Sequence, residues 1–485
     1  MARWSCAAYP AEVPATGMNA HGPLVREVSA TPAQLRRLVA RRPELFPALY
    51  DSAAVGPLAR YSVLAALPGP SLLLRGDGRL EACGVSLRRR NFLDALDEWW
   101  SAERTPPTPD GVAELPFRGG WVVFLGYEVA SCVEPKLQLP ALGANDVCAE
   151  ALRVRAALVY DHIEQRCRLV CEPGAAEGVA QVEAALAATP AGESGGTSLE
   201  AAISPGDGST GAVSEQEPDL FREAVLRAQE HIARGDIYQA NLSRGWSLRL
   251  TGQTDPEALY ERLRRANPAP FAAYANLPSL TLLSSSPERL VRVRGRTVET
   301  RPIAGTRARR GTAGSDESER RELLANAKER AEHVMLIDLE RNDLGRICEA
   351  GSVEVNEFMV TESYPHLHHI VSNVRGRLNG GIAPGATLRA VFPGGTITGC
   401  PKYRCMQIIG ELEGEARGAY TGSFGYLNTD GDMDFNILIR TATLSGAELR
   451  FRTGAGIVAD SDWQRELAET RTKAQGLLRA FGAGA

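Results

Sequence analysis

The chain has 485 residues, 44% of them hydrophobic and 23% charged, an ordinary composition for a soluble globular protein. Its 54 Lys and Arg against 59 Asp and Glu give a net charge of −5 without a long basic run, so a nucleic-acid or anionic membrane partner is not expected. No segment approaches the roughly 20 apolar residues of a spanning helix, and no signal-peptide pattern follows Met1. Nine scattered cysteines disfavour a disulfide framework, and we therefore expect a cytoplasmic protein.

The first part of the chain, residues 1–172, is predicted to be rich in β-structure. Its strand-like runs, such as 61–64 and 121–125, are bounded by Gly and Pro clusters. Residues 173–218 are rich in Ala, Gly, Ser, Glu and Pro and contain no aromatic residue, so they can bury little apolar surface. We predict a flexible linker over 173–218.

The remaining residues, 219–485, alternate between helical and strand-like patterns. Apolar residues at helical spacing predict a helix over 221–232, and further helices are predicted over 319–337 and 463–481. Strand-like runs lie at 237–242, 280–283, 437–443 and 449–451. The pattern predicts a mixed α/β (α+β) architecture.

Two glycine-rich segments imitate nucleotide-binding motifs but lack the required context. Residues 454–459 match a dinucleotide fingerprint, yet Ile457 and Val458 extend a strand rather than open a helix. Residues 394–402 imitate a phosphate-binding loop, but no Ser or Thr follows Lys402 to reach a magnesium ion. We therefore predict neither a Rossmann site nor an ATP site.

Two predicted helices each carry a pair of glutamates three residues apart, a spacing that places both on one helix face. The pairs are Glu329 with Glu332 and Glu466 with Glu469. Such pairs usually lie on a solvated surface, but Glu332 borders apolar residues, where an unpaired carboxylate is costly unless a cation or a partner meets it. Hard oxygen ligands from two helices favour a partly solvated Mg²⁺ site with room for water and a substrate carboxylate.

Further polar clusters lie in segments too rich in Gly and Pro to be regular. Glu288 follows an apolar strand, where it could be an ion-paired loop residue or a catalytic acid. Residues 365–369 contain three of the seven histidines, and residues 392–399 expose backbone donors. Each cluster also admits a purely structural explanation.

Together these segments resemble the chorismate-utilising enzymes, the family of anthranilate, aminodeoxychorismate, isochorismate and salicylate synthases. The resemblance is dense from 221 to 481 and weaker at 49–52, 60–62 and 119–127. Its main motifs are 235–242, 286–290, 302–307, 338–343 and 454–456. It implies an anthranilate synthase component I-like fold, one large α/β unit of two stacked β-sheets wrapped by helices. In that unit, residues 219–485 would be the chorismate-binding catalytic region and would pack with residues 1–172.

The resemblance also implies roles for individual residues. Mg²⁺ would be held by Glu332 and Glu469, with Glu329 and Glu466 orienting waters or ligands, and it would grip the ring carboxylate of chorismate. Glu288 matches the proposed general acid and His369 the family histidine beside the ring. The positions matched to substrate binding are Thr396, Tyr420, Arg440, Gly454, Ala455, Gly456 and Lys473.

Gln239 distinguishes between the activities of this family. Isochorismate and salicylate synthases carry a lysine at the matching position that activates water, and a neutral amide cannot serve as that base. Ammonia is therefore the expected nucleophile. Residues 237–242, 267–271, 394–399 and 433–437 look like the aminodeoxychorismate branch, which makes 4-amino-4-deoxychorismate towards 4-aminobenzoate and folate. Residues 50–52 differ from the Leu-Glu-Ser element of tryptophan-inhibited anthranilate synthases, so inhibition by tryptophan is not expected.

Ala304 departs from the aminodeoxychorismate pattern. The best-known enzymes of that branch carry a lysine there, whose amine is thought to add to the ring, whereas alanine is the anthranilate pattern. Amination at the neighbouring ring carbon with release of pyruvate is therefore the alternative. If a covalent step occurs, Cys400 is the nearest thiol in sequence, although it could equally be a small buried side chain.

The source of ammonia is expected to be another protein. The sequence offers no Cys nucleophile in a strand-to-helix elbow with a later His and Glu, so the resemblance implies a separate glutamine amidotransferase subunit. A catalytically silent scaffold for that subunit is a third alternative. The retained set of Glu288, Glu332, Arg440, Glu469 and Lys473 argues against it.

Overall fold

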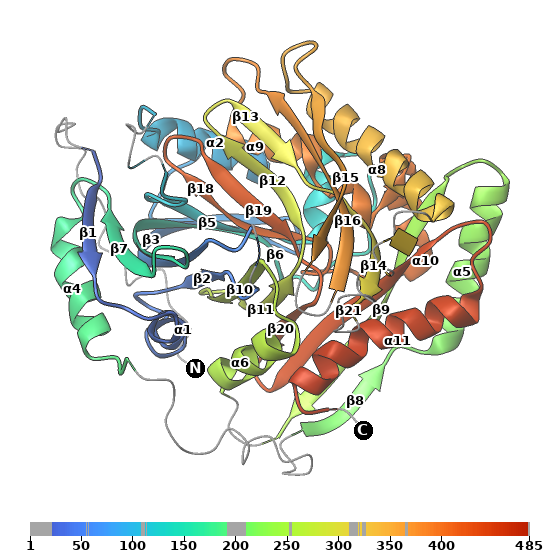
Figure 1. Ribbon diagram of the computed structural model, residues 1–485, viewed down its shortest axis with the longest axis horizontal. Coiled ribbons are helices and arrows are strands. Elements are labelled where there is room, and N and C mark those ends of the chain that lie inside the picture. Colours follow the sequence, from blue (N-terminus) through green and yellow to red (C-terminus); the bar gives the residue numbers. More distant parts are fainter. Residues whose placement is uncertain are drawn as a thin grey trace.

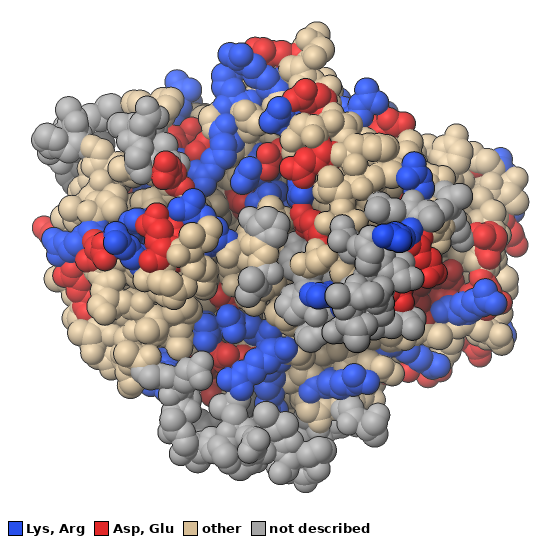
Figure 2. Space-filling model, viewed as in Figure 1, with Lys and Arg blue, Asp and Glu red and all other residues tan. Residues whose placement is uncertain are grey.

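The computed structural model describes residues 22–54, 56, 58–107, 112, 114–191, 210–251, 255–309, 319, 321–322, 326–363 and 367–483. Figure 1 shows strands through the centre of the molecule and helices around its edge. Acidic and basic side chains are interspersed over most of the face seen in Figure 2, in keeping with the small net charge. Within the described ranges, no helix is both long and apolar enough to cross a membrane.

The elements before residue 192 are mainly strands. They are β1 (Leu24–Val28), α1 (Pro32–Arg41), β2 (Ala48–Asp51), β3 (Tyr61–Arg75), β4 (Leu80–Cys83), α2 (Phe92–Glu103), β5 (Gly120–Leu125), the 3₁₀ helix η2 (Tyr127–Val129), α3 (Ala130–Val133), β6 (Val147–Asp161), β7 (Arg166–Cys171) and α4 (Ala176–Ala187).

The predicted site residues all lie after residue 209, most of them in helices and strands and Glu288, Tyr420 and Arg440 in the connections between them. The elements of this part are β8 (Thr210–Glu215), α5 (Pro218–Ala233), β9 (Gln239–Leu250), α6 (Pro256–Ala266), β10 (Phe271–Asn276), β11 (Thr281–Ser286), β12 (Arg289–Arg294), β13 (Thr297–Thr300), β14 (Ile303–Ala308), α8 (Ala327–Gly345), β15 (Glu354–Ser363), β16 (Leu367–Arg377), α9 (Pro384–Val391), the 3₁₀ helix η4 (Gly395–Ile397), β17 (Gly399–Cys400), α10 (Lys402–Glu413), β18 (Ser423–Asn428), β19 (Met433–Ile437), β20 (Thr441–Ser445), β21 (Glu448–Ile457) and α11 (Trp463–Ala480).

The strands form one continuous antiparallel ladder that folds over on itself. Its main path runs β8, β9, β21, β20, β11, β10, β2, β3, β6, β5, β18, β19, β12, β13, β16, and both β14 and β15 pair with β16. Two joints connect the halves of the chain: β10 pairs with β2, and β18 pairs with β5. Strands from 1–172 and 219–485 therefore belong to one sheet system.

Three large apolar clusters hold the sheet layers and the surrounding helices together. One lies between the folded-over parts of the ladder and includes Phe124 and Phe424, which are each 1% exposed. A second packs α2, α8 and α9 against β5 and β12, and a third packs α1, α4, α6 and α11 against the opposite end. The resulting mixed α/β fold of stacked sheet layers wrapped by helices confirms the predicted fold class.

Several predicted elements differ from the structure in their extent. Within the predicted linker, α4 packs Val182 into the third cluster, because the spacing of its apolar residues is helical despite the small-residue composition. Helix α8 ends at Gly345 rather than at residue 337. The strand predicted over 437–443 is split into β19 and β20, since Arg440 adopts a left-handed φ of 52°. Residues 192–209 of the predicted linker lie outside the described ranges.

Candidate active site

Glu288 is a buried carboxyl group in the turn between β11 and β12. Its backbone is held by the sheet, since the Ile437 backbone N–H donates to the Glu288 backbone carbonyl at 3.0 Å. Burial raises the pKa of Glu288 to about 7, opposed by the Thr396 hydroxyl, the Ile303 backbone N–H and the Arg440 guanidinium. Glu288 Oε1 has no hydrogen-bond partner within the described part of the chain. A carboxyl group in this state can hold a proton at neutral pH and donate it to a bound molecule.

The Arg440 guanidinium acts electrostatically on both Glu288 and His369. His369 is 3% exposed on β16, where it pairs with Thr306 of β14. Burial and the Arg440 guanidinium lower the pKa of His369 to about 4, so its imidazole is neutral at pH 7. Arg440 keeps its positive charge even though burial lowers its pKa. The split between β19 and β20 therefore brings a fixed cation towards both Glu288 and His369.

Gln239 contacts one of the predicted metal ligands directly. Its Nε2 donates to Glu332 Oε1 at 3.1 Å, and its side chain is 5% exposed. A Cβ added to Gly456 would lie 2.7 Å from the same Nε2. Glycine at 456 therefore leaves the space in which the Gln239 amide reaches the carboxylate of α8.

The 454–456 segment of β21 forms a second polar group with Tyr420 and Lys473. A Cβ added to Gly454 would lie 2.6 Å from the Tyr420 hydroxyl and 2.9 Å from Asn241 Oδ1. The Lys473 ammonium donates to the Gly454 carbonyl at 2.9 Å. Burial raises the pKa of Tyr420 to about 12, so the phenol keeps its proton at neutral pH. Ala455 is fully buried and contributes only its backbone to this surface.

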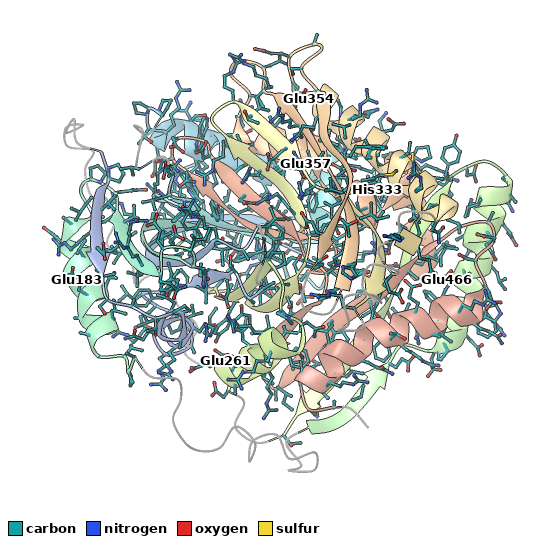
Figure 3. The ribbon with its side chains drawn as sticks, in the orientation of Figure 1. Glu183, Glu261, His333, Glu354, Glu357 and Glu466 are labelled. Atoms are coloured by element: carbon teal, nitrogen blue, oxygen red, sulfur yellow. The ribbon has the colours of Figure 1, made fainter. Side chains whose placement is uncertain are left out.

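The four glutamates of α8 and α11 lie on separate helices with different partners. Glu469 Oε1 pairs with Lys473 at 2.7 Å, and both side chains are 50% exposed. Figure 3 labels Glu466 on α11 and His333, the neighbour of Glu332, on α8. Helix α8 packs on β14 and β16, whereas α11 packs on β21. In the described ranges, no group of three or more His, Cys, Asp or Glu side chains is close enough to hold a metal ion.

Ala304 is the departure from the family lysine noted in the sequence, and Cys400 is the thiol considered there as an alternative nucleophile. Ala304 is 7% exposed on β14 and pairs with Ile370 of β16. Ile370 directly follows His369 in the chain. Cys400 pairs with Gln239 across β17 and β9. Burial and the Asp343 carboxylate raise the pKa of the Cys400 thiol, which keeps it protonated at neutral pH. The thiolate that a nucleophile requires is therefore disfavoured at this position.

Two site residues were not singled out by the sequence analysis. Asn241 Oδ1 is buried beside Gly454 without a hydrogen-bond partner in the described ranges. Glu340 is 6% exposed on α8 and lies close to Gly395, whose added Cβ would be 3.4 Å from Glu340 Oε1. The signal for Glu340 was its spacing, since residues 332, 336 and 340 follow one face of a helix.

A separate cavity of about 480 Å³ lies where the two halves of the chain meet. Its walls include Tyr50, Ser52 and Arg60 from the first half and Phe271 and Arg292 from the second. The Asp51 carboxylate at its edge accepts hydrogen bonds from Ser62, Tyr260 and Arg264. Although burial alone would raise it, Arg264 and Arg36 hold the pKa of Asp51 below its usual value. That tryptophan does not inhibit this protein stays a prediction.

Comparison with known proteins identifies the family. Residues 79–479 match the family described as chorismate binding enzyme. Aminodeoxychorismate synthase component 1 of Bacillus subtilis is 40% identical over 89% of each chain, and anthranilate synthase component 1 of Neisseria meningitidis is 37% identical over 94% of each chain. The crystal structure of anthranilate synthase component I from Streptococcus pneumoniae is 33% identical, covers 86% of this chain and 92% of that one, and superposes with a TM-score of 0.72. The chain belongs to the chorismate-binding enzymes of the anthranilate and aminodeoxychorismate synthase family.

Proposed function

We propose that this chain aminates chorismate with ammonia to give 4-amino-4-deoxychorismate, the reaction of the aminodeoxychorismate branch. The observation that carries the amination is the side chain of Gln239. Its neutral amide donates to Glu332 at 3.1 Å and cannot act as the base that a water nucleophile needs. Ammonia is itself a sufficient nucleophile, so the site needs an acid for the leaving group and no strong base for attack.

Glu288 is the proposed acid. Displacement of the ring hydroxyl by ammonia forms a C–N bond and breaks a C–O bond, and hydroxide is a poor leaving group. Proton donation by the Glu288 carboxyl lets the oxygen depart as water, and the proton lost by the attached ammonium restores the acid. The pKa of about 7 for Glu288 suits both halves of this exchange. Neutral His369 and cationic Arg440 would lie beside the ring and its carboxylates.

The glutamates of α8 and α11 provide the type of donor atom that Mg²⁺ prefers. Glu329, Glu332, Glu466 and Glu469 offer only hard oxygen donors, and the partner of Glu332 is a neutral amide that does not compete as a cation would. In our proposal Glu332 and Glu469 hold the ion, and Lys473 releases Glu469 to do so. When bound, Mg²⁺ supplies charge neutralisation for a substrate carboxylate. The Gly454 to Gly456 backbone, Tyr420 and Thr396 bind and orient the second carboxylate.

The regiochemistry of amination has one competing candidate. Ala304, buried on β14 beside His369, provides no amine for a covalent step, and relatives of comparable similarity bear the anthranilate synthase name. Amination at the neighbouring ring carbon with pyruvate release is therefore the second candidate. The motifs at 267–271, 394–399 and 433–437 and the Bacillus subtilis relative support the first. In either case we propose that a separate glutamine amidotransferase subunit delivers ammonia.

Incubation with chorismate, MgCl₂ and ammonium, followed by mass identification of the product, tests this function. We expect an amino-substituted product that keeps its enolpyruvyl group and yields 4-aminobenzoate when a lyase is added. Release of pyruvate and anthranilate by this chain alone would establish the second candidate instead. Chorismate left unconsumed under all conditions would support the silent-scaffold alternative.

A further inference from the structure

Arg417 is a buried cation in the connection between α10 and β18, three residues before Tyr420. Its side chain is 1% exposed and forms a bidentate salt bridge with Glu413, which is 2% exposed. Nη2 donates to one carboxylate oxygen at 2.6 Å and Nε donates to the other at 3.0 Å. Although burial alone would raise it, Arg417 and Arg452 hold the pKa of Glu413 below its usual value. The pair is therefore ionised at neutral pH, and its two parallel bonds fix the orientation of the guanidinium.

The guanidinium of Arg417 also joins three further segments. Nη2 donates to the Asn241 carbonyl of β9 at 2.6 Å. Nη1 donates to the Ile397 carbonyl of η4 at 3.4 Å and to the Thr421 hydroxyl at 3.2 Å. With the salt bridge, these contacts use all five N–H donors of the group. One side chain thus ties α10, β9 and η4 to the turn that carries Tyr420.

The position of Tyr420 depends on Arg417 through both its backbone and its ring. The Tyr420 backbone N–H donates to the Arg417 carbonyl at 3.2 Å, and the centre of the ring lies 5.6 Å from Arg417 Cζ, within the range of a cation–π contact. The Thr421 hydroxyl, which accepts from Arg417, donates to the Tyr420 carbonyl at 2.5 Å. Thr421 has a left-handed φ of 59°, which a β-branched residue adopts only when its surroundings impose it. The contacts of Arg417 therefore help to fix where the phenol approaches Gly454.

We propose that Arg417 is a positioning residue for chorismate binding: its guanidinium holds Tyr420 and the adjoining β9 and η4 segments where the second carboxylate of the substrate binds. This inference rests on the proposed function, in which Tyr420, Thr396 and the 454–456 backbone bind that carboxylate. Thr396 directly precedes Ile397, whose carbonyl accepts from Arg417. Because all five donors of the guanidinium are already used within the protein, Arg417 acts through its neighbours and not by touching the substrate.

Arg417→Lys tests this role while keeping a positive charge opposite Glu413. A lysine ammonium has three donors on a flexible stem and cannot join the four groups that the guanidinium joins. We expect the Kd of chorismate, measured by titration calorimetry with MgCl₂ and without ammonium, to rise by about 10–100-fold, the loss expected for one misplaced charge-assisted hydrogen bond. In turnover, KM should rise while kcat changes far less.

A milder variant removes only one contact of this cluster. Thr421→Val lacks the hydroxyl between Arg417 and the Tyr420 carbonyl and leaves the buried charges in place. It should raise the Kd of chorismate in the same direction but by less than Arg417→Lys. Wild-type affinity in these folded variants would overturn the proposal.

Arg118 provides a matched control for the loss of a buried arginine fork. Its side chain is 4% exposed and pairs with Asp430 at 2.6 Å and Asp432 at 2.8 Å, and neither partner is a predicted site residue. Arg118→Lys should lower the thermal midpoint as Arg417→Lys does, and the Kd of chorismate should stay close to wild type. An equal rise in Kd in both variants would indicate a general loss of packing and would overturn the positioning role.

A double-mutant cycle with Tyr420→Phe separates this inference from the proposed function. Tyr420→Phe removes the phenol hydroxyl, so if Arg417 acts through Tyr420, the double variant should lose much less affinity than the product of the two single effects. Effects that multiply would overturn the inference. These measurements need neither ammonia nor turnover. A wild-type protein that shows this coupling but forms no aminated product would leave the inference in place and remove only the proposed function.

Discussion

Glu288 combines burial with an oxygen that has no partner in the described ranges, which is unusual for a carboxyl group kept only for stability. We expect Glu288→Gln to lower chorismate turnover by about 10²–10⁴-fold, because the amide cannot protonate the leaving oxygen. Stability at pH 8 should not decrease, since burial raises the pKa of Glu288 to about 7 and its ionisation above that pH is unfavourable. Chorismate consumption and thermal unfolding check both parts. Near wild-type turnover would contradict the assigned acid.

Substitution of Gln239 tests whether Glu332 is a ligand of the proposed Mg²⁺ site. Replacing it with Leu removes the donor at 3.1 Å from Glu332 Oε1 without adding charge. We expect Mg²⁺ affinity to fall by about 10–100-fold, as for other losses of a group that orients a metal ligand. Titration calorimetry with MgCl₂ alone measures this without turnover. Gln229→Leu is the control, because Gln229 of α5 donates to the Ser461 carbonyl at 2.8 Å and does not bond a predicted metal ligand. Equal affinities in all three proteins would argue against Glu332 as a ligand.

Residue identities were predictable where a motif names them, and the contacts between them were not. The resemblance pointed to Glu288, Gln239 and Lys473, but not to the close approach of Gly395 in η4 to Glu340 in α8. That approach depends on the packing of η4 on α8, two segments that are distant in the sequence. The hydrophobic pattern of a short sequence segment carries no information about contacts between distant segments.

Among the secondary-structure elements, β21 is the strand whose backbone would bind a carboxylate of the substrate in our proposal. Gly454→Ala would place a methyl group 2.6 Å from both the Leu242 carbonyl and the Tyr420 hydroxyl. We expect a loss of about 1–3 kcal/mol in the free energy of unfolding, because the neighbouring backbone of β9 cannot move freely. A higher KM for chorismate should accompany it as Tyr420 is displaced.

The control for this substitution lies on the adjacent strand. A Cβ added to Gly245 of β9 would lie 3.6 Å from Arg452 Nη1, its nearest neighbour and at an ordinary contact distance. Gly245→Ala should therefore leave both unfolding and KM close to wild type. Denaturant unfolding and steady-state kinetics on the pair provide the comparison. Equal tolerance of the two substitutions would show that the approach at Gly454 is not tight.

Helices and strands could be predicted from the sequence where their hydrophobic pattern and turn residues lie within a short stretch of chain. The predicted bounds of β5 and α11 lie within one residue of the observed ones, whereas β3 continues to Arg75, far beyond the predicted run 61–64. The division between β19 and β20 was missed because a left-handed arginine leaves no trace in hydrophobic pattern. Helix α4 was missed because its small residues suggested a linker, although its buried Val182 anchors it in a core.

At the scale of the whole molecule, the two halves interlock through β10 and β18. Because β10 pairs with β2 and β11, and β18 pairs with β5 and β19, neither half has a complete sheet without the other. We expect a single cooperative thermal transition, with a calorimetric enthalpy equal to the van't Hoff enthalpy. Residues 1–172 or 219–485 expressed alone should show no cooperative transition. Two separable transitions in the full chain would contradict this interlocking.

The two joints also have a consequence for synthesis on the ribosome. Strands β2 and β5 leave the exit tunnel long before their partners β10 and β18 have been translated. Until then each presents unpaired backbone groups along one edge, which invites pairing with another nascent chain. Early termination of translation should thus yield an aggregating fragment rather than a smaller folded protein.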